Sequence, residues 1–262
     1  WLPKIHGVDA VGEPQIGKMP PMEVYRKLRV YDAAQYPTTL TMADDRGFRY
    51  YAGLSDFQHF DSYRVSAPAC DAWYLYGRRW KGGRISWGAP LEGIGEMTRT
   101  LRALNRPAPI AAWSQNVHEG WQDQISRKRR SPTADEILIQ AHQALGNGIT
   151  SLYWYSLQSW SPLRYRDTLG VTTRIGRLIR TLEPYFLTGD AYRHDRTFYQ
   201  GEVNLDLSSI VTPKAALLFV TDLTYQPNRK DRVFEFRGAR EFEASFALPG
   251  YLKNPVDVFR VD

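Results

Sequence analysis

The sequence predicts an α/β protein in which repeated β/α units are followed by a shorter all-β region. In the first two-thirds of the 262 residues, apolar β-type runs alternate with runs that have apolar residues at helical spacing. Such alternation is typical of parallel strands connected by helices. After Gly189 the pattern changes to short β-type runs separated by turn signals such as Gln226-Pro227-Asn228, as in an antiparallel sandwich. We therefore expect one domain over residues 1–188 and a second over 189–262.

The expected elements follow from residue periodicity and from residues that start or stop helices. The clearest helix start is Thr133, which can form a capping box with Glu136, and Gly146-Asn147-Gly148 ends that helix. The expected parallel strands are Ile5–Val11, Thr38–Met42, Leu54–Tyr63, Pro109–Gln115 and Ile149–Leu157, and the other expected helices are Pro21–Gln35, Leu91–Leu104 and Thr173–Phe186. The later β-type runs are Thr197–Leu207, Ala215–Tyr225, Arg232–Phe236, Glu241–Leu248 and Val256–Asp262.

Composition excludes several classes of protein. The 43% apolar and 24% charged residues are typical of a folded globular chain, and no run approaches a membrane span. The net charge of +6 includes one dense basic run at 127–130, but no nucleic-acid-binding motif accompanies it, so we expect no nucleic-acid partner. The single cysteine, Cys70, excludes an internal disulfide, and no cofactor or metal motif is present. The sequence alone leaves localisation open.

Polar residues follow the ends of the expected parallel strands. They are Glu13, Asp44, Asp61, Gln115 and Tyr155. Active sites of closed β/α barrels lie at this edge, whereas an open nucleotide-binding sheet would also carry a glycine-rich phosphate turn. The nearest match to such a turn, Gly93-Ile94-Gly95, lacks the third glycine. The pattern therefore favours about five consecutive units of a (β/α)8 barrel.

Glu13 is the best candidate for a catalytic acid. Glycoside hydrolysis needs two carboxyl groups, one that donates a proton and one that acts as nucleophile or base. A glutamate at the end of a barrel strand projects into the site, where apolar walls favour its protonated form. Taken alone, a Glu-Pro at a strand end, as in Gly12-Glu13-Pro14, is more often an acidic helix start.

Five segments carry a family resemblance: Gly12-Glu13-Pro14, Leu54–Tyr63, Ala112–Gln115, Ser131–Glu136 with Ala144–Thr150, and Leu152–Ser156. In their order and spacing they resemble the second half of clan-A-like glycoside hydrolase barrels, in particular bacterial glycosidase-like proteins. The resemblance implies strands four to eight of a TIM barrel, with strands one to three preceding Trp1, and a secreted or periplasmic enzyme acting on a carbohydrate. It therefore implies that a missing N-terminal barrel segment or another chain completes the fold.

The expected nucleophile position departs from that family pattern. Gln115 stands where the family carries a glutamate, and an amide cannot act as the nucleophile. Glu119 is one candidate for the second carboxylate, and Asp61 or Asp44 is another. The remaining alternatives are a protein that binds carbohydrate without cleaving it and a structural or assembly protein on the same scaffold.

Aromatic residues near the last two strand ends predict a sugar-stacking surface. Trp113, Trp154 and Tyr155, together with Asp44 and Gln115, are the candidate substrate-binding residues. Packing at the barrel mouth is the alternative role for these aromatic side chains. His59, His118 and Glu119 also lie near strand ends, but their spacing does not match a metal motif.

Overall fold

The computed structural model describes 7–43, 45, 47–63, 65, 91–116, 131–156, 161–199, 203–228, 231, 233–252 and 257–261. Its N-terminal part is a five-stranded parallel sheet that curls as half of a barrel, in the order β1-β2-β3-β4-β5. The strands are β1 (Val8–Asp9), β2 (Thr38–Met42), β3 (Phe57–Phe60), β4 (Ile110–Gln115) and β5 (Ser151–Tyr155). The predicted α/β class and the parallel pairing are confirmed.

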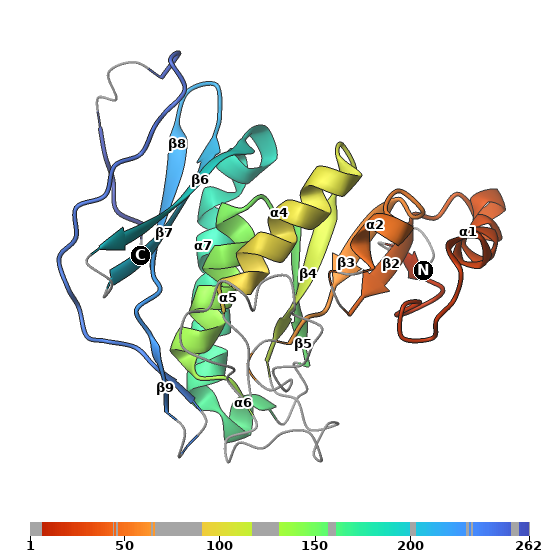
Figure 1. The fold of residues 1–262 in the computed structure, drawn as a ribbon, viewed down its shortest axis with the longest axis horizontal. Helices are drawn as coiled ribbons and strands as arrows, with labels where there is room; N and C mark the ends of the chain where they lie inside the picture. Colours follow the sequence, from red (N-terminus) through yellow and green to blue (C-terminus); the bar gives the residue numbers. More distant parts are fainter. Residues whose placement is uncertain are drawn as a thin grey trace.

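Helices cover one face of this sheet. Their bounds are α1 (Pro21–Arg29), α2 (Phe48–Tyr51), α4 (Gly93–Asn105), α5 (Ala134–Gly146), α6 (Ser161–Arg164) and α7 (Arg166–Thr188), with the short 3-10 helix η2 (Asp32–Ala34). Figure 1 shows α1 and α2 at one end of the molecule and α4, α5 and α7 in its middle. The main core lies between the sheet and these helices, where Leu40, Met42 and Phe60 pack with Met97 and Leu101.

Alternation along the strands separates two chemically different faces. Leu40, Phe60 and Ala112 belong to the core beneath the helices. The residues one position before or after them face the side that the helices leave uncovered, because successive side chains of a strand point to opposite faces. This face carries mainly polar and aromatic residues on β2 to β5, with the small Ala111 among them: Thr39, Thr41, Phe57, His59, Trp113, Gln115, Tyr153 and Tyr155.

The C-terminal region contains a three-stranded antiparallel sheet in the order β6-β7-β8 and a separate β9-β10 pair. The bounds are β6 (Asp190–Tyr199), β7 (Val203–Val211), β8 (Ala216–Asp222), β9 (Gln226–Asn228) and β10 (Val233–Glu235). The layer facing the three-stranded sheet is helical: Ile210 and Phe219 pack in the main core with Ala144 and Leu145 of α5. Of the expected β-sandwich, the structure shows the antiparallel sheet. The layer packed against that sheet is helix α5 of the half-barrel and not a second β-sheet.

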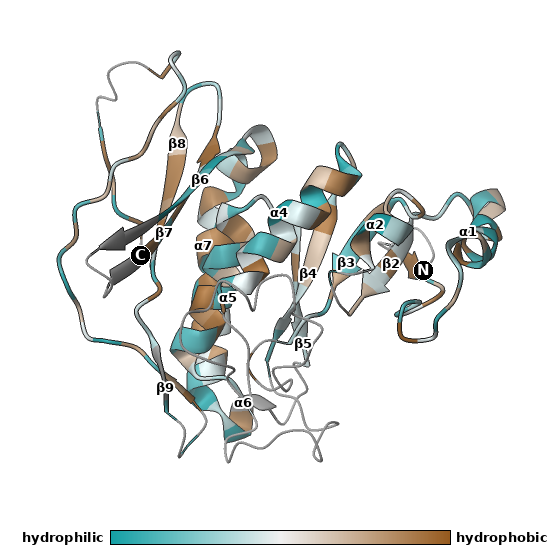
Figure 2. Ribbon diagram, in the orientation of Figure 1, coloured by the Kyte–Doolittle hydropathy of each residue, from teal (hydrophilic) through white to brown (hydrophobic). Residues whose placement is uncertain are grey.

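Gly146 permits this close packing. A Cβ atom at this position would lie 2.2 Å from Ser208 Oγ and 2.9 Å from a ring carbon of Phe219. The last turn of α5 therefore approaches the antiparallel sheet more closely than any other residue type would allow. Figure 2 shows that β4 and β8, on either side of α5, are both largely apolar.

Several sequence expectations need correction. The expected single strand 197–207 is divided between β6 and β7, because the apolar residues at its two ends belong to different arms of a hairpin. Residues 241–248 and 257–261 form no strand, since their alternating residues are mostly exposed and pair with no neighbour. Helix α7 begins at Arg166, seven residues before the expected start at Thr173, because 166–172 continues its amphipathic pattern.

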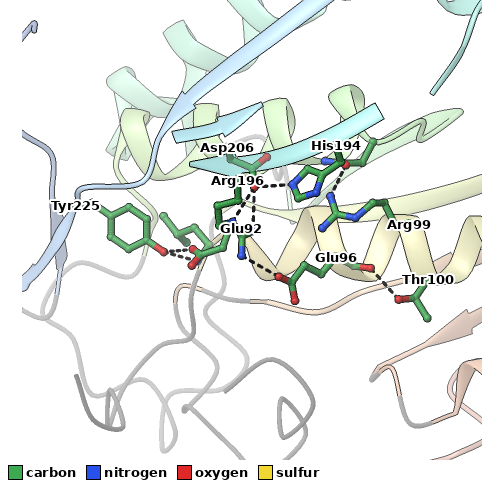
Figure 3. Close-up of polar contacts among 10 residues, drawn as sticks. Glu92, Glu96, Arg99, Thr100, His194, Arg196, Asp206 and Tyr225 are labelled. Carbon is green, nitrogen blue, oxygen red and sulfur yellow. Dashed lines mark hydrogen bonds and ion pairs between the residues drawn. The ribbon is translucent and has the colours of Figure 1, made fainter. Parts of the chain in front are cut away.

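A buried polar network joins the antiparallel sheet to α4 (Figure 3). Arg196 on β6 donates to Asp206 on β7 through Nε at 3.2 Å and Nη2 at 2.8 Å, and to Glu96 on α4 through Nη1 at 3.0 Å. His194 Nε2 lies 2.9 Å from the same Asp206 oxygen. Glu92, one turn before Glu96, accepts a hydrogen bond from the Tyr225 hydroxyl.

Candidate functional site

The turn that carries Glu13 is held by the side chain of Asp9, at the end of β1. Asp9 Oδ1 accepts the backbone N–H groups of Gly12 at 2.9 Å and Val11 at 3.4 Å. Its other oxygen accepts the hydroxyl of Thr41 on β2 at 2.6 Å. Gly12 has a φ of 66°, a backbone conformation that glycine adopts without steric cost. This turn brings Glu13 to the carboxyl-terminal edge of the parallel sheet.

Asp61 reaches the same edge from β3. Its backbone N–H donates to the Met42 carbonyl of β2 at 3.2 Å, and Ser62 Oγ donates to the Ala43 carbonyl at 2.9 Å. These two contacts extend the pairing of β2 and β3 beyond the last residues of the strands. The direction in which Asp61 leaves β3 is therefore fixed by its neighbour β2.

Glu13 and Asp61 form a close carboxyl pair. Burial raises the pKa of Asp61 to about 8, and the charge of Glu13 and a hydrogen bond shared with Glu13 act in the same direction. The charge of Asp9 adds a smaller effect. Two carboxylates in contact cannot both be ionised without strong repulsion, so a proton is retained near neutral pH. The candidate site therefore holds an acid and an acceptor oxygen side by side.

An aromatic group lies beside this pair. Tyr63, two residues after Asp61, stacks on Tyr155 with ring centroids 5.2 Å apart and an interplanar angle of 24°. Burial, followed by the charges of Asp61, Tyr155 and Glu13, raises the pKa of Tyr63 well above its usual value, so the phenol stays neutral. Trp113 meets the Tyr155 ring edge-on at 6.4 Å, and Tyr155 is 41% exposed. Tyr155 thus presents a ring to solvent at the edge where the carboxyl pair lies.

Trp154 and Gln115, two of the expected substrate-binding residues, contact other parts of the protein. Trp154 packs with α5 and α7 in the cluster around Ile137 and Ile175, on the opposite face of the sheet from Tyr155. Gln115 is fully buried, and its Oε1 accepts the backbone N–H of Val65 at 2.9 Å. Asp44 and Glu119, two further candidates, lie outside the described residues.

The sequence alone did not indicate Asp9 and Tyr63 as parts of the site. Tyr63 could have been identified from the sequence, because it lies two residues after Asp61. In an extended chain, residues two positions apart point to the same side. The sequence indication for Asp9 is weaker. Asp9 lies at a strand end three residues before a glycine, a pattern typical of a side chain that accepts backbone N–H groups in a turn.

Neither a metal centre nor a membrane span is found in the described part of the chain. Within the ranges given above, no three His, Cys, Asp or Glu residues lie together as potential metal ligands. Among the same residues, no helix combines the length and apolar character needed to cross a bilayer.

Comparison with known proteins assigns no family. No family model matches the chain, and no curated protein or solved structure matches it.

Proposed function

We propose that this chain is part of a glycoside hydrolase-like protein that acts on a carbohydrate, with Glu13 as general acid/base. The observation that carries the proposal is the convergence of Glu13 and Asp61 from two different strands into a pair that retains a proton near neutral pH. A general acid works best when its pKa lies near the working pH, because it is then protonated and still able to release the proton.

In this proposal Asp61 is the proton partner of Glu13. Carboxyl groups lie about 5–5.5 Å apart in retaining glycosidases and about 6.5–9.5 Å apart in inverting ones. Two carboxyl groups in hydrogen-bond contact leave no room for a sugar carbon between them. Asp61 therefore holds and returns the proton of Glu13, and the second catalytic carboxylate comes from elsewhere, with Glu119 and Asp44 as the candidates on this chain.

Tyr155 supports a carbohydrate as the substrate. Pyranose rings present flat C–H faces, which stack on exposed aromatic rings, and Tyr155 offers such a ring next to the acid. The sheet geometry supports the same class of protein. A curled parallel sheet with its polar residues at the carboxyl-terminal edge has the arrangement of half a β/α barrel site.

The proposal is tested by hydrolysis of aryl glycosides that cover the common sugars and both anomers. We expect release of the phenol by the natural chain and a loss of at least 100-fold in kcat/KM for Glu13→Gln, which removes the acid. Glu23→Gln is the matched control, because Glu23 is an exposed glutamate of α1 that pairs only with Lys27 in the described structure. Equal activity of Glu13→Gln and the control would contradict the assignment.

A second candidate function is carbohydrate binding without cleavage, and the amide of Gln115 favours it. Its buried oxygen bonds to backbone where a nucleophilic carboxylate was expected. This alternative predicts that Glu13→Gln retains binding to immobilised polysaccharides, that Tyr155→Ala loses it, and that no aryl glycoside is hydrolysed. Affinity gel electrophoresis of the two variants separates the two functions.

A further inference from the structure

Gln115 has an unusual position for a polar side chain at the end of a parallel strand. It is the last residue of β4 and has no exposed surface, although its neighbour Tyr155 on β5 is 41% exposed. Its Oε1 accepts the N–H of Val65, fifty residues earlier in the chain. A side chain without exposed atoms cannot contact a dissolved ligand, so the contact with Val65 favours a structural role for Gln115.

Val65 is one of the described residues at which the half-barrel contacts the C-terminal region. It follows Asp61 by four residues and Tyr63 by two, and its side chain is fully buried. Its hydrophobic cluster contains residues from the C-terminal region. The other fully or nearly buried members are Leu91, Ile139, Leu223, Tyr225 and Phe234.

Tyr225 reinforces this contact by hydrogen bonds. Its hydroxyl accepts the N–H of Leu91 at 2.8 Å and donates to the carboxylate of Glu92. Leu91 and Val65 thus belong to one hydrophobic cluster, and Tyr225 forms a hydrogen bond with Leu91. The C-terminal region thereby supports the chain that leaves the candidate site.

We infer that Gln115 is a positioning residue of the candidate site, which holds Val65 against the C-terminal region and so keeps Asp61 beside Glu13. This inference rests on the proposed function in one respect, the identification of Glu13 and Asp61 as the functional carboxyl pair. Asp61 and Ser62 are held by their contacts with β2, and Val65 is held by its N–H and its side chain. Loss of the second attachment lets water reach Asp61 and lets it move away from Glu13.

The test compares Gln115→Leu, which removes the accepting oxygen, with Gln115→Glu, which keeps one. Gln140→Leu is the matched control, because Gln140 is an equally buried glutamine on α5 that bonds to a helix carbonyl. The titration of Asp61 is followed by ¹³C NMR of labelled aspartate, and the exchange of the Val65 amide by hydrogen exchange. Neither measurement needs a substrate, so failure of the hydrolysis assay does not decide this result.

In Gln115→Leu we expect the Asp61 pKa to fall by at least one unit and the Val65 amide to exchange at least tenfold faster. Gln140→Leu should resemble the natural chain in both measurements, and Gln115→Glu should keep the slow exchange of the Val65 amide. A folded Gln115→Leu with unchanged titration and exchange would overturn the inference, as would equally fast Val65 exchange in Gln115→Glu. If Gln115→Leu does not fold, Val65→Ala decides the matter: it should lower the Asp61 pKa, and an unchanged titration overturns the inference.

Discussion

The ionised form of Asp61 lowers the free energy of unfolding, because the folded environment favours the neutral carboxyl group. Burial is the main cause, and the adjacent Glu13 adds to it. The unfolded chain ionises Asp61 near the ordinary value of 3.8, whereas the folded chain retains the proton to about pH 8. Between these values the unfolded state binds fewer protons than the folded state. The contribution of Asp61 to the free energy of unfolding is therefore fully present below pH 3.8 and is lost as the pH rises toward 8.

Replacement of Asp61 by Asn should remove this dependence on pH. The amide stays neutral and can donate a hydrogen bond to the Glu13 carboxylate. We expect Asp61→Asn to raise the free energy of unfolding by about 1–3 kcal/mol at pH 8.5 and by less than about 1 kcal/mol at pH 4.5. Urea unfolding of both proteins at the two pH values measures the difference. A stabilisation that is larger at pH 4.5 than at pH 8.5 would contradict the assigned direction.

The sequence located the two carboxyl residues because each follows a strand-like run. Parallel strands end at one edge of a sheet, so Glu13 and Asp61 were both expected there. The surroundings of Gln115 were not predictable, because the bond to Val65 depends on where the chain turns fifty residues earlier. Trp154 was predictable in principle: the residue next to a site-facing Tyr155 points to the other face of the same strand.

At the scale of elements, helix α5 begins with the predicted capping box, and Glu136 of that box has a second role. The capping box is confirmed: Thr133 Oγ1 accepts the Glu136 N–H at 3.3 Å, and Glu136 Oε2 accepts the Thr133 N–H at 2.7 Å. The structure adds that Glu136 Oε1 accepts the N–H of Phe234 on β10 at 2.9 Å. One carboxylate therefore satisfies the start of a helix and attaches a strand from the C-terminal region.

These two roles predict unequal effects of substitution. Thr133→Ala should lower the free energy of unfolding by about 1 kcal/mol, the usual effect of losing an N-cap. Glu136→Ala should lower it by about 2–4 kcal/mol, because two N–H groups then lose their acceptor in a buried setting. Glu136→Gln keeps only one of the two acceptor contacts, because the amide has a single acceptor oxygen, and its effect should lie between those of the other two variants. Chemical denaturation ranks the three variants, and equal effects of Thr133→Ala and Glu136→Ala would show that the Phe234 contact contributes nothing.

Elements with strong local signals were predicted more accurately than those defined by pairing. The strand expected at Thr38–Met42 agrees with β2 at both ends, because its apolar and β-branched run begins after Pro37 and ends before the polar residues that follow Ala43. The hairpin of β6 and β7 was missed, because an antiparallel pair is defined by distant cross-strand partners such as Asp190 with Val211. Local periodicity contains no information about which of several short β-type runs pair.

For the whole molecule, the half-barrel and the antiparallel sheet behave as one packed unit. They share the main hydrophobic core, and the network of Figure 3 crosses between them through Arg196. Asp206 and Glu96 are 1% and 5% exposed, so their charges depend on that guanidinium. Burial alone would raise the pKa of Asp206, but His194 and Arg196 outweigh burial and lower it.

Loss of Arg196 should therefore destabilise the whole protein. In Arg196→Met two buried carboxylates lose their shared cation, and removal of one partner from such a group typically lowers the free energy of unfolding by about 3–5 kcal/mol. Adding Asp206→Asn removes one of these two buried charges, so the double variant should recover part of that loss in a double-mutant cycle.

The pH dependence of this loss provides an independent check. Because the Asp206 pKa is lowered on folding, its contribution is fully present above the ordinary value of 3.8 and is lost as the pH falls through the lowered value. The difference between natural chain and Arg196→Met should therefore be largest near neutral pH and should shrink below about pH 4. Urea unfolding at pH 7 and pH 3.5 tests this, with Arg193→Met as control, because Arg193 pairs with the exposed Asp195 on the same strand. A loss in Arg196→Met that is equal at both pH values, or no larger than that of the control, would show that the sheet is held to the half-barrel by apolar packing alone.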